Sequence, residues 1–126
     1  MRQTDSTSDP PPFDYKTEKS YNQRLQEAES IRRKYPKRVP CIVGPAPKSR
    51  VSDIPQHKFL VQDNLTLGQF YYTIRKKIQL RADQALFFFC NDTIPSTSCT
   101  IGELYSEFCD DDKFLYLTYS DENTYG

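Results

Sequence analysis

The sequence predicts an α+β domain in which helices pack on one sheet. Three observations lead to this fold class. The chain has 126 residues, which suits one domain with one hydrophobic core. Short runs of apolar, aromatic and β-branched residues, typical of strands, alternate with segments whose apolar residues recur at the period of a helix. The motifs Thr-x-x-Gln and Thr-x-x-Glu, which are helix capping boxes, begin two of these helical segments.

The N-terminal part is expected to contain an extension followed by a helix. Residues 1–14 are polar and include Pro10 to Pro12, which indicates a flexible segment. From about Lys16 to Tyr35 the apolar residues recur every three or four positions, and Pro36 ends the pattern. The segment from Lys16 to Arg38 holds eight basic and three acidic residues, so its exposed face is either simply solvated or binds an anionic surface. The apolar stripe consists of Tyr21, Leu25, Ala28, Ile31 and Tyr35.

Two strands and a second helix come next. Val39 to Val43 and Lys58 to Val61 predict antiparallel strands joined by a long loop. Thr66 and Gln69 form the capping box that begins the helix. Gly68 in the first turn costs about 1 kcal/mol relative to alanine, so we expect it to mark a close approach of another backbone segment. The apolar stripe consists of Leu67, Phe70, Tyr71, Ile74 and Ile78.

The C-terminal half adds two strands around a short helix. Leu86 to Cys90 is apolar throughout and predicts a strand, and Thr100 with Glu103 begins the short helix. Phe114 to Tyr119 is apolar on both faces, which indicates a strand in the interior of the sheet. A hairpin, a long helix and two further strands give the β-grasp arrangement of ubiquitin. We therefore predict a four-stranded mixed sheet with an additional N-terminal helical region.

The residues after the last predicted strand are polar up to Thr124, and Tyr125 and Gly126 follow. Most chain ends are frayed. A glycine on a polar stalk can also enter a narrow enzyme channel, because it has no Cβ and few restrictions on its backbone. The residues alone leave both interpretations open.

The composition argues against several classes of function. The net charge is zero, which gives no preference for nucleic acid, and neither a signal peptide nor a membrane-spanning stretch is present. One histidine, His57, and four scattered glycines cannot form a metal cluster, a catalytic triad or a phosphate-binding loop. We therefore expect a cytoplasmic protein that is not an enzyme and has no cofactor. The cysteines lack CxxC spacing, which predicts buried thiols in a reducing compartment: Cys41, Cys90, Cys99 and Cys109.

One known family resembles the chain in five stretches from about Tyr15 to Gly126. The stretches are KRVPCIV, HKFLV, LTLGQFYYTIRKKIQL, FFFCNDT and FLYLTYSDENTYG. They are similar to the GABARAP family of autophagy-related ubiquitin-like modifiers, which includes yeast autophagy-related protein eight. The resemblance implies a domain over residues 15–119, preceded by the 1–14 extension and followed by a flexible tail over 120–126.

The resemblance also implies what the protein does. Its terminal glycine, Gly126 here, would be activated by ubiquitin-like E1 and E2 conjugation enzymes and joined to phosphatidylethanolamine. A processing or delipidating cysteine protease acts on members of this family. The protein would be a monomer in the cytoplasm before conjugation. After lipidation it would recruit cargo receptors to the autophagosome membrane.

A peptide-binding groove is a further implication of the resemblance. In this family a peptide with the motif aromatic-x-x-aliphatic adds a strand to the sheet edge, here Lys58 to Val61. Arg38 and Lys58 would meet acidic residues that flank the motif. The implied aromatic pocket is lined by Glu27, Ile31, Pro40, Ile42, Lys58, Leu60 and Phe114. The implied aliphatic pocket is lined by Phe59, Val61, Leu65, Phe70 and Ile74.

Several of these residues are equally explained as core, namely Ile31, Ile42, Phe70, Ile74 and Phe114. Lys58 and Leu60 are better placed for binding, because alternation along an edge strand can send both to the same outer face. A second partner surface is implied at Leu86, Phe87, Phe88 and Phe89, although an apolar strand is usually core.

The chain departs from the family pattern at three places. Gln62 and Thr73 stand where a proline and a larger aliphatic residue are common, and Arg81-Ala82 replaces a frequent proline pair. We expect these changes to alter the peptide preference of the aliphatic pocket and to leave the aromatic pocket intact.

Two alternatives remain open at this point. The chain could be a ubiquitin-like adaptor that is never conjugated. It could also bind anionic surfaces, such as tubulin tails or acidic lipid, through the helix between Lys16 and Arg38. That binding would fall steeply with salt, whereas apolar peptide docking would not.

Overall fold

The computed structural model describes residues 14–122. The predicted N-terminal extension up to residue 13, and residues 123–126 with Gly126, lie outside the described residues. The predicted order of helices and strands is confirmed, except that the first helix is divided into two. The elements are α1 (Tyr15–Glu18), α2 (Tyr21–Lys34), β1 (Arg38–Pro45), β2 (Lys58–Gln62), α3 (Leu67–Ile78), β3 (Phe87–Phe89), α4 (Ile101–Phe108) and β4 (Leu115–Ser120).

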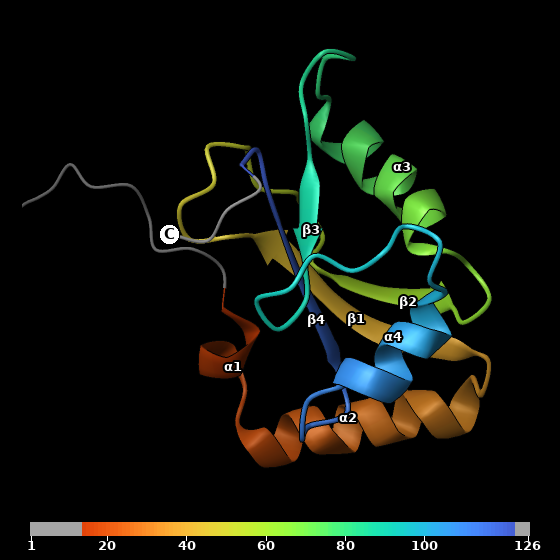
Figure 1. Cartoon of the computed structure of the whole chain (residues 1–126). Helices are drawn as coiled ribbons and strands as arrows, with labels where there is room; N and C mark the ends of the chain where they lie inside the picture. Colours follow the sequence, from red (N-terminus) through yellow and green to blue (C-terminus); the bar gives the residue numbers. More distant parts are fainter. Residues whose placement is uncertain (1–13, 123–126) are drawn as a thin grey trace, which may run out of the picture.

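The strands form one four-stranded mixed sheet in the order β2-β1-β4-β3 (Figure 1). β1 pairs antiparallel with β2 and parallel with β4, and β3 pairs antiparallel with β4. The predicted sheet is therefore confirmed, and so is the interior position of β4. This order leaves β2 and β3 as the two edges of the sheet.

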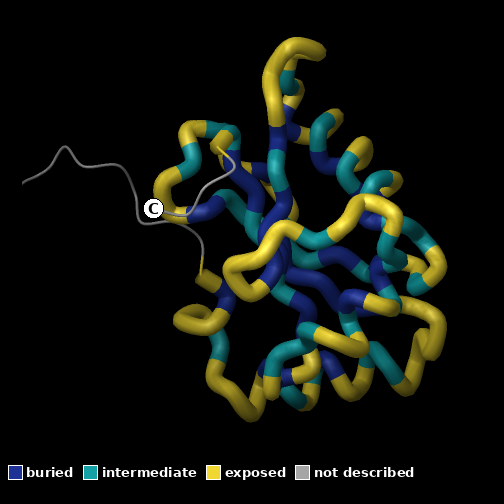
Figure 2. The backbone as a smooth tube through the Cα atoms, viewed as in Figure 1, coloured by how far each residue is buried: buried dark blue, intermediate teal, exposed yellow. Residues whose placement is uncertain are grey.

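Helices cover both faces of the sheet. On one face, apolar residues of α3 and α4 pack with the buried side chains of the strands into the main core cluster. On the other face, α1 and α2 enclose a smaller cluster of Tyr15, Ala28, Ile42 and Phe114. Figure 2 shows the buried residues concentrated along the strands and the exposed residues in the loops and on the outer helix surfaces.

The prediction of a single helix from Lys16 to Tyr35 is wrong, because the helix is interrupted between Glu18 and Tyr21. Ser20 caps α2: its side chain accepts from the Gln23 backbone N–H, while the Gln23 side chain accepts from the Ser20 N–H. This reciprocal capping box starts a new helix and leaves α1 as one short turn. Tyr21 and Tyr35, predicted in the apolar stripe, are 46% and 43% exposed. Of the predicted stripe the helix buries only Ala28 fully, and it also buries Arg24, which was not predicted.

Arg24 is buried because it is paired with a carboxylate from the turn before β4. Its Nη1 donates to Asp112 Oδ2 at 2.6 Å, and the two side chains are 10% and 0% exposed. Asp112 also accepts from the Phe114 backbone N–H at 3.0 Å and from the Tyr116 hydroxyl. This network ties α2 to the start of β4 across the small core cluster.

The helices of the other face begin as predicted. Thr66 and Thr100 form complete capping boxes with Gln69 and Glu103. The close approach predicted at Gly68 is confirmed, since a Cβ there would lie 3.2 Å from the backbone oxygen of Thr97. A second close approach, not predicted from the sequence, occurs at Gly102, where a Cβ would lie 3.0 Å from the Asp63 backbone oxygen.

The cysteines are only partly as predicted. Cys41 and Cys90 are buried, whereas Cys99 and Cys109 are half-buried. Burial raises the pKa of the Cys90 thiol to about 11. Cys90 therefore remains a protonated, unreactive thiol at neutral pH.

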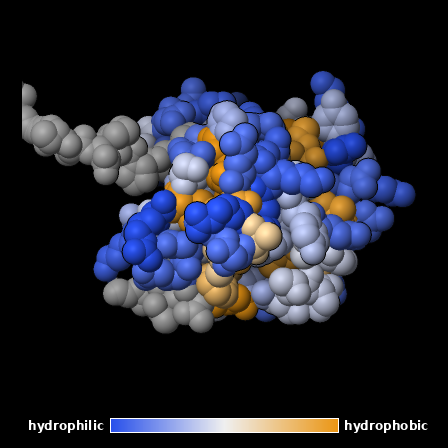
Figure 3. All heavy atoms as spheres, turned by 90° about the horizontal axis from the view of Figure 1, so that it is seen from above, coloured by the Kyte–Doolittle hydropathy of each residue, from blue (hydrophilic) through white to orange (hydrophobic). Residues whose placement is uncertain are grey.

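The outer surface is largely polar on the side seen in Figure 3. Hydrophilic side chains cover most of this face, and apolar atoms show only in small areas between them. Within residues 14–122, no helix has the length and apolar character needed to cross a membrane.

Candidate functional site

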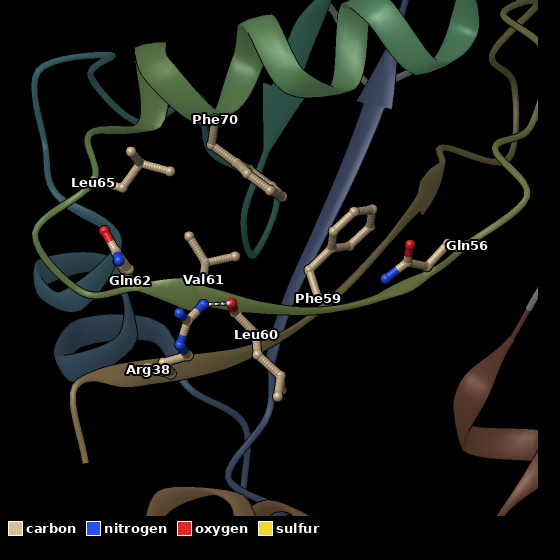
Figure 4. Close-up of a pocket in the computed structure, with 8 residues that line it drawn as sticks. All are labelled: Arg38, Gln56, Phe59, Leu60, Val61, Gln62, Leu65 and Phe70. Carbon is tan, nitrogen blue, oxygen red and sulfur yellow. Dashed lines mark hydrogen bonds between the residues drawn. The ribbon is translucent and has the colours of Figure 1, made fainter. Parts of the chain in front are cut away.

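The edge strand β2 presents different side chains to the two faces of the sheet. Phe59 and Val61 are buried in the main core, on the side of α3. Lys58 and Leu60 are only half-buried, and Leu60 points away from α3 in Figure 4. The prediction that alternation sends Lys58 and Leu60 to the same outer face is therefore confirmed.

The register of β1 against β2 determines which backbone groups face outward. Val43 N donates to His57 O at 2.8 Å at one end of the pair, and Asp63 N donates to Lys37 O at 2.9 Å at the other. Because hydrogen-bonded and non-bonded pairs alternate along antiparallel strands, the even-numbered residues of β2 direct their N–H and C=O groups away from β1. These outward-facing residues are Lys58, Leu60 and Gln62.

A hollow of about 330 Å³ lies beside β2 on the side of α3 (Figure 4). The ring of Phe70 forms part of its wall and packs edge-on against Phe59, with centroids 5.5 Å apart. Ile74, predicted for the aliphatic pocket, does not line this hollow and is fully buried in the core. The lining residues are Arg38, Gln56, Phe59, Leu60, Val61, Gln62, Leu65 and Phe70.

On the side of α2, the structure brings the residues of the predicted aromatic pocket together, but several of them are core. Ile42 and Phe114 are buried with Ala28, and Pro40 is fully buried opposite Leu60. Their role in the free protein is therefore to support the surface. The half-buried residues that a ligand could contact are Glu27, Ile31, Lys58 and Leu60.

Glu27 links α2 to the edge strand. Its carboxylate accepts from Lys58 Nζ, from the Tyr15 hydroxyl and, at 3.3 Å, from Lys19 Nζ. Burial alone would raise the pKa of Glu27, but the hydrogen bonds from Lys58 and Tyr15 outweigh burial and lower the pKa. Glu27 is therefore ionised at neutral pH, and it holds the Lys58 ammonium beside Leu60.

Two exposed side chains approach the outer edge of β2. Arg38 Nη1 donates to Leu60 O at 3.0 Å, the bond drawn in Figure 4. Gln56 Nε2 donates to Lys58 O at 2.7 Å. Arg38 is among the residues predicted from the sequence, whereas Gln56 is not. The period-two pattern of Lys58, Leu60 and Gln62 extends back to Gln56, so the alternation could have indicated it.

The predicted second surface lies on β3, at the opposite edge of the sheet. Leu86, Phe88 and Phe89 are buried, and Phe87 is half-buried. Phe88 stacks on Phe70 at 6.2 Å, so it belongs to the same core that supports the hollow beside β2. Any contact at this edge would therefore rest on Phe87 and the backbone of β3.

A mixed four-stranded sheet with a helix crossing one face and an open edge strand places the protein in the ubiquitin-like class. A family model described as "Autophagy protein Atg8 ubiquitin like" matches residues 23–126. The chain belongs to the Atg8 family, and the resemblance noted in the sequence is thereby confirmed. Proteins of this family are ubiquitin-like modifiers in autophagy rather than enzymes. The match begins inside α2, so α1 lies outside it.

Solved structures agree with this membership. ATG8 of Trypanosoma brucei is 38% identical and superposes with a TM-score of 0.83, covering 90% of this chain and 98% of that chain. Atg8 of Plasmodium falciparum, in complex with a Plasmodium falciparum Atg3 peptide, is 30% identical with a TM-score of 0.82. That comparison covers 90% of this chain and 99% of the Plasmodium chain.

Proposed function

We propose that this autophagy modifier binds peptides of the aromatic-x-x-aliphatic type at the β2 edge and is conjugated through Gly126 to phosphatidylethanolamine. The observation that carries the peptide proposal is the pair of surfaces on either side of β2. One is the hollow beside α3, and the other is the half-buried surface of Ile31 and Leu60 beside α2. The Plasmodium relative is in complex with a peptide of Atg3, which supports peptide binding in general.

The spacing of the motif suits this geometry. Side chains alternate between the faces of an extended strand, so two anchors three positions apart point to opposite faces. A peptide strand added to the outward N–H and C=O groups of Lys58 and Leu60 therefore sends one anchor to each side of the sheet. The aromatic anchor would contact Ile31 and Leu60, and the aliphatic anchor would enter the hollow between Val61 and Leu65.

Calorimetric titration tests this assignment with two variants and matched peptides. Ile31→Ala should weaken binding of the intact peptide but have little further effect once the peptide aromatic residue is replaced by alanine. Leu65→Ala should show the same coupling to the aliphatic residue. The proposed orientation would be contradicted if Ile31→Ala were coupled to the aliphatic residue and Leu65→Ala to the aromatic one. It would also be contradicted if the effects of the protein and peptide substitutions simply added for every pair.

Conjugation to a two-chain lipid would explain how a domain with a polar surface stays on a membrane. One acyl chain gives only marginal binding, at about 0.8 kcal/mol per buried CH₂, whereas two chains anchor stably. Ubiquitin-like E1 and E2 enzymes would perform the conjugation, and a cysteine protease would process or delipidate the product. The protein would then move from the cytoplasm to the autophagosome membrane, where cargo receptors bind it.

Intact-mass measurement of the protein from cytosolic and membrane fractions tests the conjugation. We expect a membrane form heavier by one phospholipid, which is lost in Gly126→Ala. If no heavier form is found in cells that have active conjugation enzymes and induced autophagy, the protein is an unconjugated adaptor. Release from membranes by salt alone would instead favour binding of an anionic surface.

A further inference from the structure

The acceptors that an added peptide strand needs on β2 are already occupied in the free protein. The outward carbonyl of Leu60 accepts from the Arg38 guanidinium at 3.0 Å, and the outward carbonyl of Lys58 accepts from the Gln56 amide at 2.7 Å. These carbonyls are two residues apart on the same edge, which is the spacing at which an extended strand offers successive N–H groups to one partner.

Such capping has a clear physical benefit. An uncovered edge strand is a template for pairing with any other extended chain, and proteins commonly protect such edges with charged side chains. Both capping side chains also line the hollow beside β2, and both are exposed. They can therefore leave the edge without disturbing the core.

The two caps differ in what can remove them. Gln56 is neutral, and any peptide N–H that replaces its amide makes an equivalent bond to Lys58 O. Arg38 is a cation, and its bond to a neutral carbonyl is weaker than the bond it would make to a carboxylate. An acidic residue of the peptide near Arg38 therefore draws the guanidinium away from Leu60 O and provides it with a stronger partner.

We propose that Arg38 and Gln56 cap the β2 edge and that an acidic residue of the peptide releases the Arg38 cap. Arg38 then determines specificity in two ways: it attracts acidic peptides, and it opposes strand addition by neutral ones. This inference rests on the proposed peptide binding at β2. It goes further by predicting that loss of Arg38 strengthens the binding of peptides without acidic flanking residues.

The test uses two aromatic-x-x-aliphatic peptides that differ only in the residues flanking the motif, which are Glu in one and Gln in the other. Calorimetry measures their dissociation constants with the full chain and its Arg38→Ala variant. We expect Arg38→Ala to bind the Gln-flanked peptide about twofold to threefold more tightly, because the exposed cap no longer competes. The Glu-flanked peptide should bind at least threefold more weakly, since its charge partner is gone.

Further variants separate the caps from general charge effects. Gln56→Ala should tighten both peptides by a similar factor, and Arg38→Lys should keep the preference for Glu. Lys48→Ala is the matched control, because it removes one exposed positive charge beyond the opposite end of β1. It should change both dissociation constants equally and by less than twofold. Thermal unfolding of each variant confirms that the fold is intact.

The outcomes are distinguishable. If Arg38→Ala weakens both peptides, or weakens only the Glu-flanked one without strengthening the other, Arg38 binds acid but does not cap the edge, and the inference is overturned. If neither peptide binds the unmodified protein, peptide recognition at β2 itself fails. Tighter binding of the Gln-flanked peptide to Arg38→Ala, with weaker binding of the Glu-flanked one, supports the inference.

Discussion

Gln62 is the residue most able to change the selectivity of the hollow beside β2. It is exposed at the end of the strand and lines the hollow together with Val61 and Leu65 (Figure 4). An amide at this position is less favourable to a buried aliphatic side chain than the proline that the family resemblance implies here. Its own N–H faces outward, so a proline here would remove no bond to β1.

We expect Gln62→Pro to change the order in which peptides with Leu, Ile or Val at the aliphatic position bind. The preferred peptide should gain about fourfold in affinity, which corresponds to about one additional buried methylene. Titrations of the three peptides against both proteins measure the effect. An identical ranking and equal affinities would mean that Gln62 does not contribute to the selectivity of the hollow.

Substitution of the buried Asp112 is expected to have a large effect on stability. Its side chain is fully buried and pairs with Arg24, the Phe114 backbone N–H and the Tyr116 hydroxyl. Asp112→Asn keeps the shape but leaves the guanidinium without its charge partner. Removing one member of a buried ion pair typically destabilises a protein by about 3 kcal/mol or more.

Urea denaturation measures this effect, with Asp111→Asn as the matched control. Asp111 is the exposed neighbour, so its substitution should change the free energy of unfolding by less than about 0.5 kcal/mol. Equal effects of the two substitutions would show that the Arg24 pair does not stabilise the fold.

At the scale of elements, α2 is attached to the edge strand through Glu27 and Lys58. The pKa of Glu27 is lower in the folded protein than its ordinary value. The ionised Glu27 carboxylate stabilises the fold fully at pH values above the pKa that it has in the unfolded chain, about 4.3. This stabilisation is lost as the pH falls through the lower pKa that Glu27 has in the folded protein. Acid should therefore loosen the contact between α2 and β2.

Glu27→Gln isolates this effect. The variant should be less stable than the unmodified protein at pH 7, and its stability should fall less between pH 6 and pH 3. Glu29→Gln is the matched control, an exposed glutamate of the same helix. Urea denaturation across this pH range checks the expectation. Parallel stability curves for the unmodified protein and Glu27→Gln would exclude Glu27 as a source of acid sensitivity.

Periodicity in the sequence predicted the elements well but not all of their limits. The capping boxes at Thr66 and Thr100 and the apolar strands were read directly. The break at Ser20 was missed because the helical period continued across it, although Ser20 and Gln23 carry the capping signal. At Ser20 two local patterns conflict: the apolar period predicts a continuous helix, whereas the capping box predicts a new helix start.

The site was predicted less completely than the fold, for a physical reason. Which face Lys58 and Leu60 occupy follows from alternation within one strand. The bonds from Arg38 and Gln56 to the strand edge depend on the register of β1 against β2, which connects residues far apart in the sequence. The approach of Gly102 to Asp63 is likewise a tertiary contact that no local pattern records.

At the scale of the whole molecule, the loop between β1 and β2 contacts both the start of the C-terminal tail and the hollow beside β2. Near its beginning, Arg50 Nε lies 2.9 Å from Asp121 Oδ2, and its Nη2 lies 3.2 Å from Glu122 Oε1. Near its end, Gln56 caps the β2 edge. Between these points Ile54 is buried in the main core, 2% exposed, and anchors the loop.

This arrangement should keep the tail independent of the hollow beside β2. The proposed conjugation through Gly126 and the proposed peptide binding at β2 both require such independence. Arg50→Ala should increase the fast motion of Asp121 and Glu122, seen as lower backbone heteronuclear NOE values. The Arg50 side chain is 76% exposed, so the loss of its ion pairs should hardly change global stability. Peptide affinity at β2 should stay within twofold, because the Ile54 anchor separates Arg50 from Gln56. Lys48→Ala, in the same loop, should leave both the NOE values and the affinity unchanged. A change of more than threefold in peptide affinity with Arg50→Ala would instead mean that the loop transmits the state of the tail to the groove.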